Sequence, residues 1–346
     1  MINWVPRKNI DTELVNELLK KSLESNQFTN NGPNVQQLEA FIRDKFNIDD
    51  EKSVIVVTNG AVALHSITAG IQYTEQKMIT WATQSFTFPP SAQSNLSNVQ
   101  IIDIDHDGGI DLTLIDDTIN GIIITNIFGN IVDISKYTEW AKLNNKFVIF
   151  DNAATAYTYY KGKNCLNYGN GCTISFHHTK PFGFGEGGAI IVDKKYEHSI
   201  RCLNNFGINL TNEYWVKEGN NNKMSDISAV YILQFLMNNF DKIVNHHNKL
   251  YNYFIEKTTN YKSIPFKLFP SFHDRIIVPS CLCLLFDNYN DNIRLKLLEN
   301  NIYCRKYYYP LKNTKVACEI FDSILCISLT TEMTIDDIDI IYELVV

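Results

Sequence analysis

Lys180, a lysine in a glycine-rich loop, is the residue of this chain best placed to do chemistry. Its surroundings, Ser175 to Gly188, read SFHHTKPFGFGEGG and lie between two apolar segments, 171–176 and 189–192, that predict strands. A lysine framed in this way is positioned and partly desolvated, so its amine can form a Schiff base with an aldehyde. Taken alone, the pattern is more typical of an ordinary turn between two strands.

Two groups upstream could hold the rest of an aldehyde cofactor. Asp151 follows the apolar segment 146–150 and could pair with a protonated ring nitrogen, or cap a following helix. Asn59, Gly60 and Ala61 join a predicted strand to a predicted helix, where free amides bind phosphate, although glycine at such a turn can be geometry alone. Aldehyde, ring nitrogen and phosphate are the three handles of pyridoxal 5'-phosphate (PLP).

Further side chains extend this hypothesis. The Ser175 hydroxyl could donate to the phosphate or bond to backbone, and Phe88 could lie flat on a pyridine ring or belong to the core. His177 and His178 flank the lysine and are interpreted as pocket or packing residues. We expect no metal, because no other ligands stand at suitable spacing from these histidines.

Strand and helix patterns alternate through the first two thirds of the chain. We expect strands at 53–57, 78–81, 100–104, 121–127 and 146–150, and helices at 61–71 and 135–143. Such alternation is typical of an α/β domain with a mostly parallel sheet, whose sites lie at the carboxyl ends of strands. Asn59, Phe88, Asp151 and Lys180 all follow a predicted strand, as that rule requires.

The pattern changes after residue 224 and predicts a second, smaller domain. A long helical pattern starts at 227, and it is followed by a strand at 276–286, a helix at 292–299, a strand at 323–329 and a helix at 335–344. This order is typical of an α+β domain. We place the large domain at 1–235 and the small C-terminal domain at 236–346.

Composition narrows the function classes. The net charge of −7, from 31 basic and 38 acidic residues, argues against a nucleic-acid partner. Cys281 and Cys283 alternate in an apolar strand, which is more typical of buried thiols than of metal ligands. No signal-peptide core and no bilayer-length apolar run is present, so we expect a cytoplasmic protein without a membrane partner. Nicotinamide, P-loop and serine-hydrolase motifs are missing from the sequence.

Taken in order, these motifs resemble one family. The matching segments include NGPNVQQLE at 31–39, TNGAVAL at 58–64, SFTFP at 85–89, DNAA at 151–154, the loop at 175–188, GNNNKMSD at 219–226 and YCRKYYYPL at 303–311. They resemble the DegT/DnrJ/EryC1/StrS sugar aminotransferases over nearly the whole chain, most closely the viosamine and perosamine synthase branch. The resemblance implies the aspartate aminotransferase-like (fold-type I PLP) fold, with a mixed, mostly parallel sheet.

The resemblance also implies residue roles. Lys180 would bind the cofactor and move protons, Asp151 would pair with the pyridinium nitrogen, and Phe88 would stack on the ring. A homodimer would share its sites, with phosphate contacts from Gly60, Ala61, Ser175 and the neighbouring subunit's Asn221, and substrate contacts from His178, Lys223, Arg305 and Tyr308.

This chain departs from the family pattern at two positions. The family usually has Thr in place of Ala61, and Gln, His or Glu in place of Ala154, where Thr155 would have to serve the cofactor's ring oxygen. A dehydratase subgroup carries His in place of the lysine. The presence of Lys180 therefore favours transamination.

The reaction implied is amination of a nucleotide-linked (UDP or dTDP) 4-keto-6-deoxy-D-glucose to the viosamine-type 4-amino-4,6-dideoxy sugar. L-Glutamate would be the donor, and the cofactor would cycle through pyridoxamine phosphate. Three alternatives stay open: amination at C3 of a 3-keto sugar, a non-catalytic PLP-binding regulator, and an α/β protein without PLP.

Overall fold

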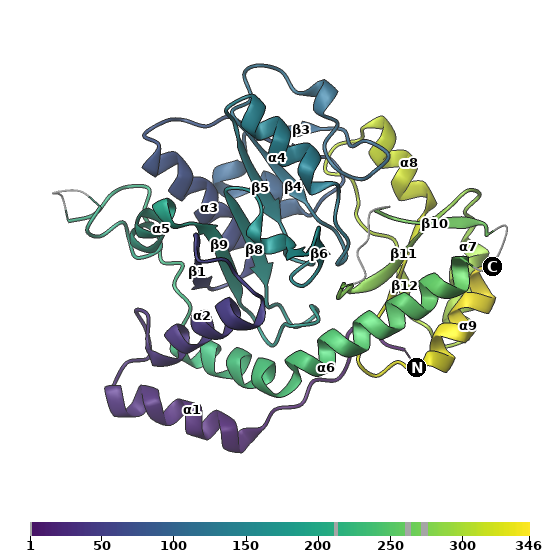
Figure 1. Cartoon of the computed structure of the whole chain (residues 1–346), viewed down its shortest axis with the longest axis horizontal. Coiled ribbons are helices and arrows are strands. Elements are labelled where there is room, and N and C mark those ends of the chain that lie inside the picture. The colour runs from purple at the N-terminus through teal and green to yellow at the C-terminus, as the bar shows by residue number, and fades with distance from the viewer. Residues whose placement is uncertain (1, 211–213, 260–263, 271–275) are drawn as a thin grey trace.

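The computed structural model describes residues 2–210, 214–259, 264–270 and 276–346. A large α/β part and a smaller α+β part lie side by side, and the 34-residue helix α6 (Asp226–Thr259) runs beneath both (Figure 1). The long helical pattern that starts at residue 227 is thereby confirmed, and the helix continues ten residues past Lys249.

The large sheet has seven strands. Their spatial order is β1 (Lys52–Val57), β9 (Gly188–Asp193), β8 (Gly171–Ser175), β5 (Phe147–Asp151), β4 (Gly121–Thr125), β2 (Trp81–Gln84) and β3 (Gln100–Ile102). β9 runs antiparallel to both neighbours, and the remaining pairs are parallel. This confirms the mixed, mostly parallel sheet, and it brings the carboxyl ends of β1, β2, β4, β5 and β8 to one edge.

Helices cover both faces of this sheet because its strands are apolar on both sides. On β4, Ile122 and Ile124 pack towards α2 (Pro33–Lys45), α4 (Ile134–Leu143) and α6, with α1 (Thr12–Ser25) outside them. Ile123 packs on the opposite face, towards α3 (Gly60–Thr74) and α5 (Glu197–Leu203). α1 is capped at its start, since the Asp11 carboxylate accepts the Leu14 N–H.

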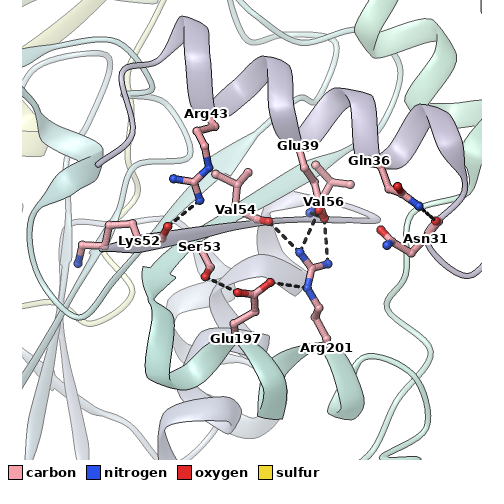
Figure 2. A network of polar contacts seen from close by, with 10 residues as sticks. All are labelled: Asn31, Gln36, Glu39, Arg43, Lys52, Ser53, Val54, Val56, Glu197 and Arg201. Carbon is pink, nitrogen blue, oxygen red and sulfur yellow. Dashed lines mark hydrogen bonds and ion pairs between the residues drawn. The ribbon is translucent and has the colours of Figure 1, made fainter. Parts of the chain in front are cut away.

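An arginine joins the elements at the outer edge of this sheet. Arg201 on α5 donates to both carboxylate oxygens of Glu39 on α2, at 3.1 and 2.9 Å, and to Glu197 at 2.8 Å (Figure 2). Glu39 in turn accepts the Val56 N–H of β1, and Glu197 accepts the Ser53 hydroxyl. The bidentate pair fixes α2 and α5 against β1, immediately before the turn that leads into α3.

The small part is built on an antiparallel sheet in the order β10 (Phe266–Leu268), β11 (Cys281–Phe286), β13 (Ile324–Ser328), β12 (Cys304–Arg305). Leu282 and Leu284 of β11 face the helices α7 (Asp291–Glu299), α9 (Ile335–Val345) and the end of α6. Cys281 and Cys283 face the other way, into an apolar cluster with Phe86 and Phe128 of the large part. β11 thus holds the two parts together.

Some elements differ from the sequence prediction. The strand expected at 78–81 lies at 81–84, because Thr83 and Gln84 are buried although polar, and Gln84 is satisfied by the Thr125 N–H at 2.9 Å. α8 (Lys315–Ser323) and the β6 (Tyr159–Tyr160) and β7 (Lys163–Asn164) hairpin were not expected.

The first residues of the chain pack against the small part of the molecule. Ile2 pairs with Ile302, and its side chain packs against the core of the small part. The domain boundary near residue 235 stays a prediction.

Candidate active site

A cavity of about 540 Å³ lies at the carboxyl edge of the large sheet, a size typical of small-molecule sites. The sheet side contributes the ends of β1, β5 and β8, and the small part contributes Ser280, immediately before β11, and residues at and after the end of β12. Of the residues that the sequence singled out, the cavity lining includes Gly60, Ala61, Phe88, Asp151, Ser175, Lys180, Arg305 and Tyr308.

Lys180 reaches this cavity from the loop between β8 and β9. The loop closes on itself, since the His178 N–H donates to the Gly185 carbonyl and the Gly183 N–H donates to the Lys180 carbonyl. Burial lowers the pKa of the Lys180 amine, and the nearby Asp151 charge opposes that shift. A lysine amine of lowered pKa is a better nucleophile at neutral pH.

Asp151 is buried at the end of β5, with 6% of its surface exposed. Its Oδ1 accepts the Thr173 hydroxyl at 2.6 Å and the Ala153 N–H at 3.1 Å. Oδ2 has no hydrogen-bond partner among the residues described. Burial raises the Asp151 pKa, against the Thr173 bond and the Lys180 charge. No helix starts directly after Asp151, since the next helical turn begins at Cys165, and this excludes the helix-cap alternative.

The turn after β1 has the local geometry of an anion-binding site. The Asn59 side chain caps α3 by accepting the Val62 N–H at 2.9 Å, and the Gly60 and Ala61 amides have no partner within the described residues. A Cβ on Gly60 would lie 2.8 Å from the Ser175 Cβ, so only glycine lets the start of α3 approach β8 this closely. The Ser175 hydroxyl therefore stands beside the free amides.

Aromatic side chains from both parts of the molecule border the opening. Phe88 keeps 54% of its surface exposed, which excludes the core alternative, and its ring lies 5.9 Å from the Tyr308 ring. Tyr308 also stacks on Phe128 at 5.0 Å. Arg305 donates to the Tyr307 hydroxyl at 2.7 Å and lies exposed at the cavity. An exposed guanidinium beside flat rings suits an anionic ligand that carries an aromatic base.

Three predicted site residues do not line the cavity of their own chain. His178 packs its ring edge-on against Phe184, 5.4 Å away, and faces away from the lining. Asn221 is exposed, and Lys223 is held by Asn205 and Asn221 at 2.7 Å each, beside the end of β1. Their roles stay predictions.

The sequence matches the DegT/DnrJ/EryC1/StrS aminotransferase family model over residues 9–345. The chain belongs to that family. As a member of it, this aminotransferase is a PLP-dependent transaminase. The fold is the one expected, and no helix among the described residues is long and apolar enough to cross a bilayer.

Individual relatives are more distant. This aminotransferase is 27% identical to the dTDP-4-amino-4,6-dideoxy-D-glucose transaminase of Shigella dysenteriae, over 92% of this chain and 91% of that protein. It shares its fold with a putative PLP-dependent aminotransferase from Bacillus cereus, at 21% identity and a TM-score of 0.83, with 99% of each chain covered. An Escherichia coli GDP-4-keto-6-deoxy-D-mannose-3-dehydratase has the same TM-score at 17% identity and full coverage of both chains.

The residues of this aminotransferase fit PLP on three observations. The half-buried Lys180 side chain lines the cavity, the Asp151 Oδ2 has no protein partner among the described residues, and the amides at the start of α3 have none either. These are the groups that an aldehyde, a ring nitrogen and a phosphate require.

Sequence reasoning missed several residues at the site. Thr173 stands two residues before Ser175 on the same face of β8, and this period of two is the signal that could have found it. Trp4 lines the cavity from the chain start, where no periodic pattern points to it. His177, which the sequence analysis interpreted as a pocket or packing residue, does line the cavity, whereas His178 does not, and the His177 Nε2 lies 3.4 Å from Glu186.

A cluster of thiols lies behind the cavity wall. The sulfur atoms of Cys281, Cys283 and Cys326 lie within 4.8 Å of one another, and all three side chains are buried. In the described part of the chain no fourth His, Cys, Asp or Glu joins this group, whereas structural zinc sites have four ligands. The interpretation of Cys281 and Cys283 as buried thiols is consistent with their apolar surroundings.

Proposed function

We propose that this aminotransferase transfers the amino group of L-glutamate to C4 of a nucleotide-linked 4-keto-6-deoxy-D-glucose. The product would be a viosamine-type 4-amino-4,6-dideoxy sugar on dTDP or UDP. The observation that carries the proposal is the meeting of Lys180, Asp151 and the free amides of α3 around one cavity. The full-length likeness to a dTDP-4-amino-4,6-dideoxy-D-glucose transaminase supports the choice of carbon and carrier.

Each site residue then has a task. Bound PLP supplies an electron sink for the substrate carbon. Lys180 carries a proton to and from that carbon, and the Asp151 Oδ2 holds the proton on the ring nitrogen. Phe88 covers one face of the ring. The Gly60 and Ala61 amides and the Ser175 hydroxyl bind the phosphate through the positive end of α3.

The substrate is bound at the open side of the cavity. The exposed guanidinium of Arg305 pairs with the nucleotide diphosphate, and Tyr308 borders the sugar. His178 and Lys223 do not line the cavity of their own chain, so they bind substrate only by reaching the cavity of the neighbouring subunit. Their position outside the cavity of their own chain supports a shared site.

Asn221 points to a homodimer on the same grounds. It is exposed and does not line its own cavity, so it completes a phosphate site only from the neighbouring subunit. Sedimentation that found monomers alone at working concentration would contradict this proposal.

The decisive experiment compares Lys180→Ala with Lys194→Ala. Lys194 is an exposed lysine that follows β9 and lies outside the cavity. We expect Lys180→Ala to lose about a thousandfold or more of glutamate half-reaction rate, since general acid–base groups contribute about 10²–10⁴. Lys194→Ala should keep the wild-type rate. Appreciable transamination by Lys180→Ala would overturn the assignment.

Two alternatives are tested with the same preparation. Incubation with 4-keto and 3-keto nucleotide sugars separates amination at C4 from amination at C3. A regulator would bind PLP but leave its absorbance unchanged when L-glutamate is added.

The eight unpaired cysteines fit the reducing cytoplasm in which we place the protein, and cell fractionation tests that placement.

A further inference from the structure

A second lysine, Lys8, is bound to the backbone of the loop that carries Lys180. Its Nζ donates to the carbonyls of His178 at 2.8 Å, Lys180 at 2.6 Å and Gly183 at 2.5 Å. A lysine ammonium has three N–H donors, and the three carbonyls that it contacts all lie within residues 178–183 of one loop. Lys8 therefore fixes the backbone on both sides of Lys180 as well as Lys180 itself.

The carbonyl oxygens of His178, Lys180 and Gly183 converge on one point, since each lies 2.5–2.8 Å from the Lys8 Nζ. The Lys180 carbonyl already accepts the Gly183 N–H at 3.0 Å, and the His178 N–H reaches back to Gly185. Convergent carbonyl dipoles repel one another unless a donor or cation stands between them. Removal of the Lys8 ammonium leaves three carbonyl acceptors facing a half-buried space.

Nothing else in the surroundings of Lys8 explains its burial. Among the described residues no carboxylate forms an ion pair with its amine, and the other ionisable residues that line the same small cavity carry no negative charge: Arg7, Lys180, Lys242 and His247. The Phe235 ring lies 5.0 Å below the ammonium. Burial lowers the Lys8 pKa to about 7, whereas the three carbonyl contacts favour the charged form.

The segment that carries Lys8 connects the lysine loop to the small part of the molecule. Ile2 pairs with Ile302, and the Trp4 carbonyl accepts the Ser328 hydroxyl at 3.0 Å. The Trp4 ring lies 5.0 Å from the Arg305 guanidinium. Residues 2–8 thus connect the substrate side of the cavity to the backbone beneath Lys180.

We propose that Lys8 is a positioning residue, which holds the backbone of residues 178–183 so that the Lys180 amine points at the cofactor aldehyde. The proposal rests on the proposed role of Lys180. Misplacement of a reacting group by about 1 Å can cost roughly a hundredfold in rate. Loss of Lys8 therefore slows cofactor capture by Lys180 without removing the phosphate and ring-nitrogen contacts.

The test compares three variants of the full chain. Lys8→Met removes the donors and keeps a stem of similar length, Lys8→Arg keeps the charge and the N–H donors, and Lys242→Met is the control from the same small cavity. The first measurement, on cofactor-free protein, is hydrogen exchange of the 178–185 amides. We expect at least tenfold faster exchange in Lys8→Met, partial rescue by Lys8→Arg and no change in the control.

The second measurement separates positioning from general damage. PLP capture by Lys180 is followed by borohydride reduction and peptide mass spectrometry, and pyridoxamine phosphate, which cannot attach to lysine, reports the remaining contacts. We expect tenfold or slower capture by Lys8→Met, with pyridoxamine phosphate affinity within twofold of wild type. If Lys8→Met does not fold, Lys8→Gln, with a shorter amide donor, takes its place.

The outcomes distinguish this inference from the function on which it rests. Wild-type exchange and capture in Lys8→Met would overturn the positioning role. Equal loss of capture and of pyridoxamine phosphate affinity would also overturn it, since that result indicates general damage. Reduction products on a lysine other than Lys180 would instead overturn the proposed function, whatever the exchange data show.

Discussion

Thr173 gives the sharpest test of how the proposed cofactor contact at Asp151 is built. Its hydroxyl donates to the Asp151 Oδ1 at 2.6 Å, and both residues are buried. Thr173→Val keeps the shape of the side chain and removes the donor. Thr173→Ser keeps the hydroxyl, and Thr83→Val, a buried threonine on β2 of the same sheet, serves as the matched control.

The magnitude follows from the charge of Asp151 in the two states. Burial raises the Asp151 pKa in the protein without cofactor and so favours the neutral carboxyl, to which a hydrogen bond from Thr173 is worth about 0.5–1.5 kcal/mol. Paired with a protonated ring nitrogen, the carboxylate is ionised, and a bond to a charged group is worth about 1.5–3 kcal/mol. The difference, about 1–1.5 kcal/mol, corresponds to roughly a five- to tenfold weaker affinity for PLP.

The assay is titration of cofactor-free protein with PLP, alongside urea unfolding of the same samples. Thr173→Val should bind PLP five- to tenfold more weakly, Thr173→Ser should remain within about twofold of wild type, and Thr83→Val should bind normally. Wild-type affinity in Thr173→Val would refute the reasoning, because Asp151 would then not be charged against the cofactor ring. Equal weakening in Thr83→Val would attribute the effect to the sheet as a whole.

Two further predictions concern close packing and acid stability. Gly60→Ala places a Cβ 2.8 Å from the Ser175 Cβ, so we expect at least tenfold weaker PLP binding and about 1–3 kcal/mol lower stability, measured by titration and urea unfolding; unchanged binding would contradict the phosphate site. His247 is buried, contacts the Pro279 carbonyl oxygen at 2.8 Å, and has its pKa lowered by burial to about 4. The unfolded chain therefore binds more protons between pH 6.5 and 4, and roughly 3 kcal/mol of stability is lost as the pH falls through that window. His247→Asn keeps a donor for Pro279 and should flatten this limb of the pH–stability curve; an unaltered slope would contradict it.

The sequence could predict the strands that deliver the main site residues because those strands are short apolar runs buried on both faces. The runs before Asp151 and Ser175 are β5 and β8, within one residue of the expected bounds. The parallel pairing of β5 with β8, which brings both residues to one edge, was decided by the tertiary structure, because no α-helix joins these two strands. The bounds of β2 were not predicted correctly, because its buried Thr83 and Gln84 are polar and their hydrogen-bond partners lie on β4, far along the chain.

The sequence by itself determined the family, the mixed α/β fold and the identity of the loop lysine, since these depend on local patterns of apolar residues, glycines and motif order. Tertiary structure alone decided which side chains support that lysine. Lys8 contacts the loop from 170 residues and more away, and Trp4 reaches the cavity from the chain start. Neither residue lies in a periodic segment. Residues 2–8 form no helix or long strand, and their position depends on contacts with two distant elements, so their sequence shows no hydrophobic repeat. The same reason applies to Asn221, whose exposed position beside β1 depends on how the chain returns before α6.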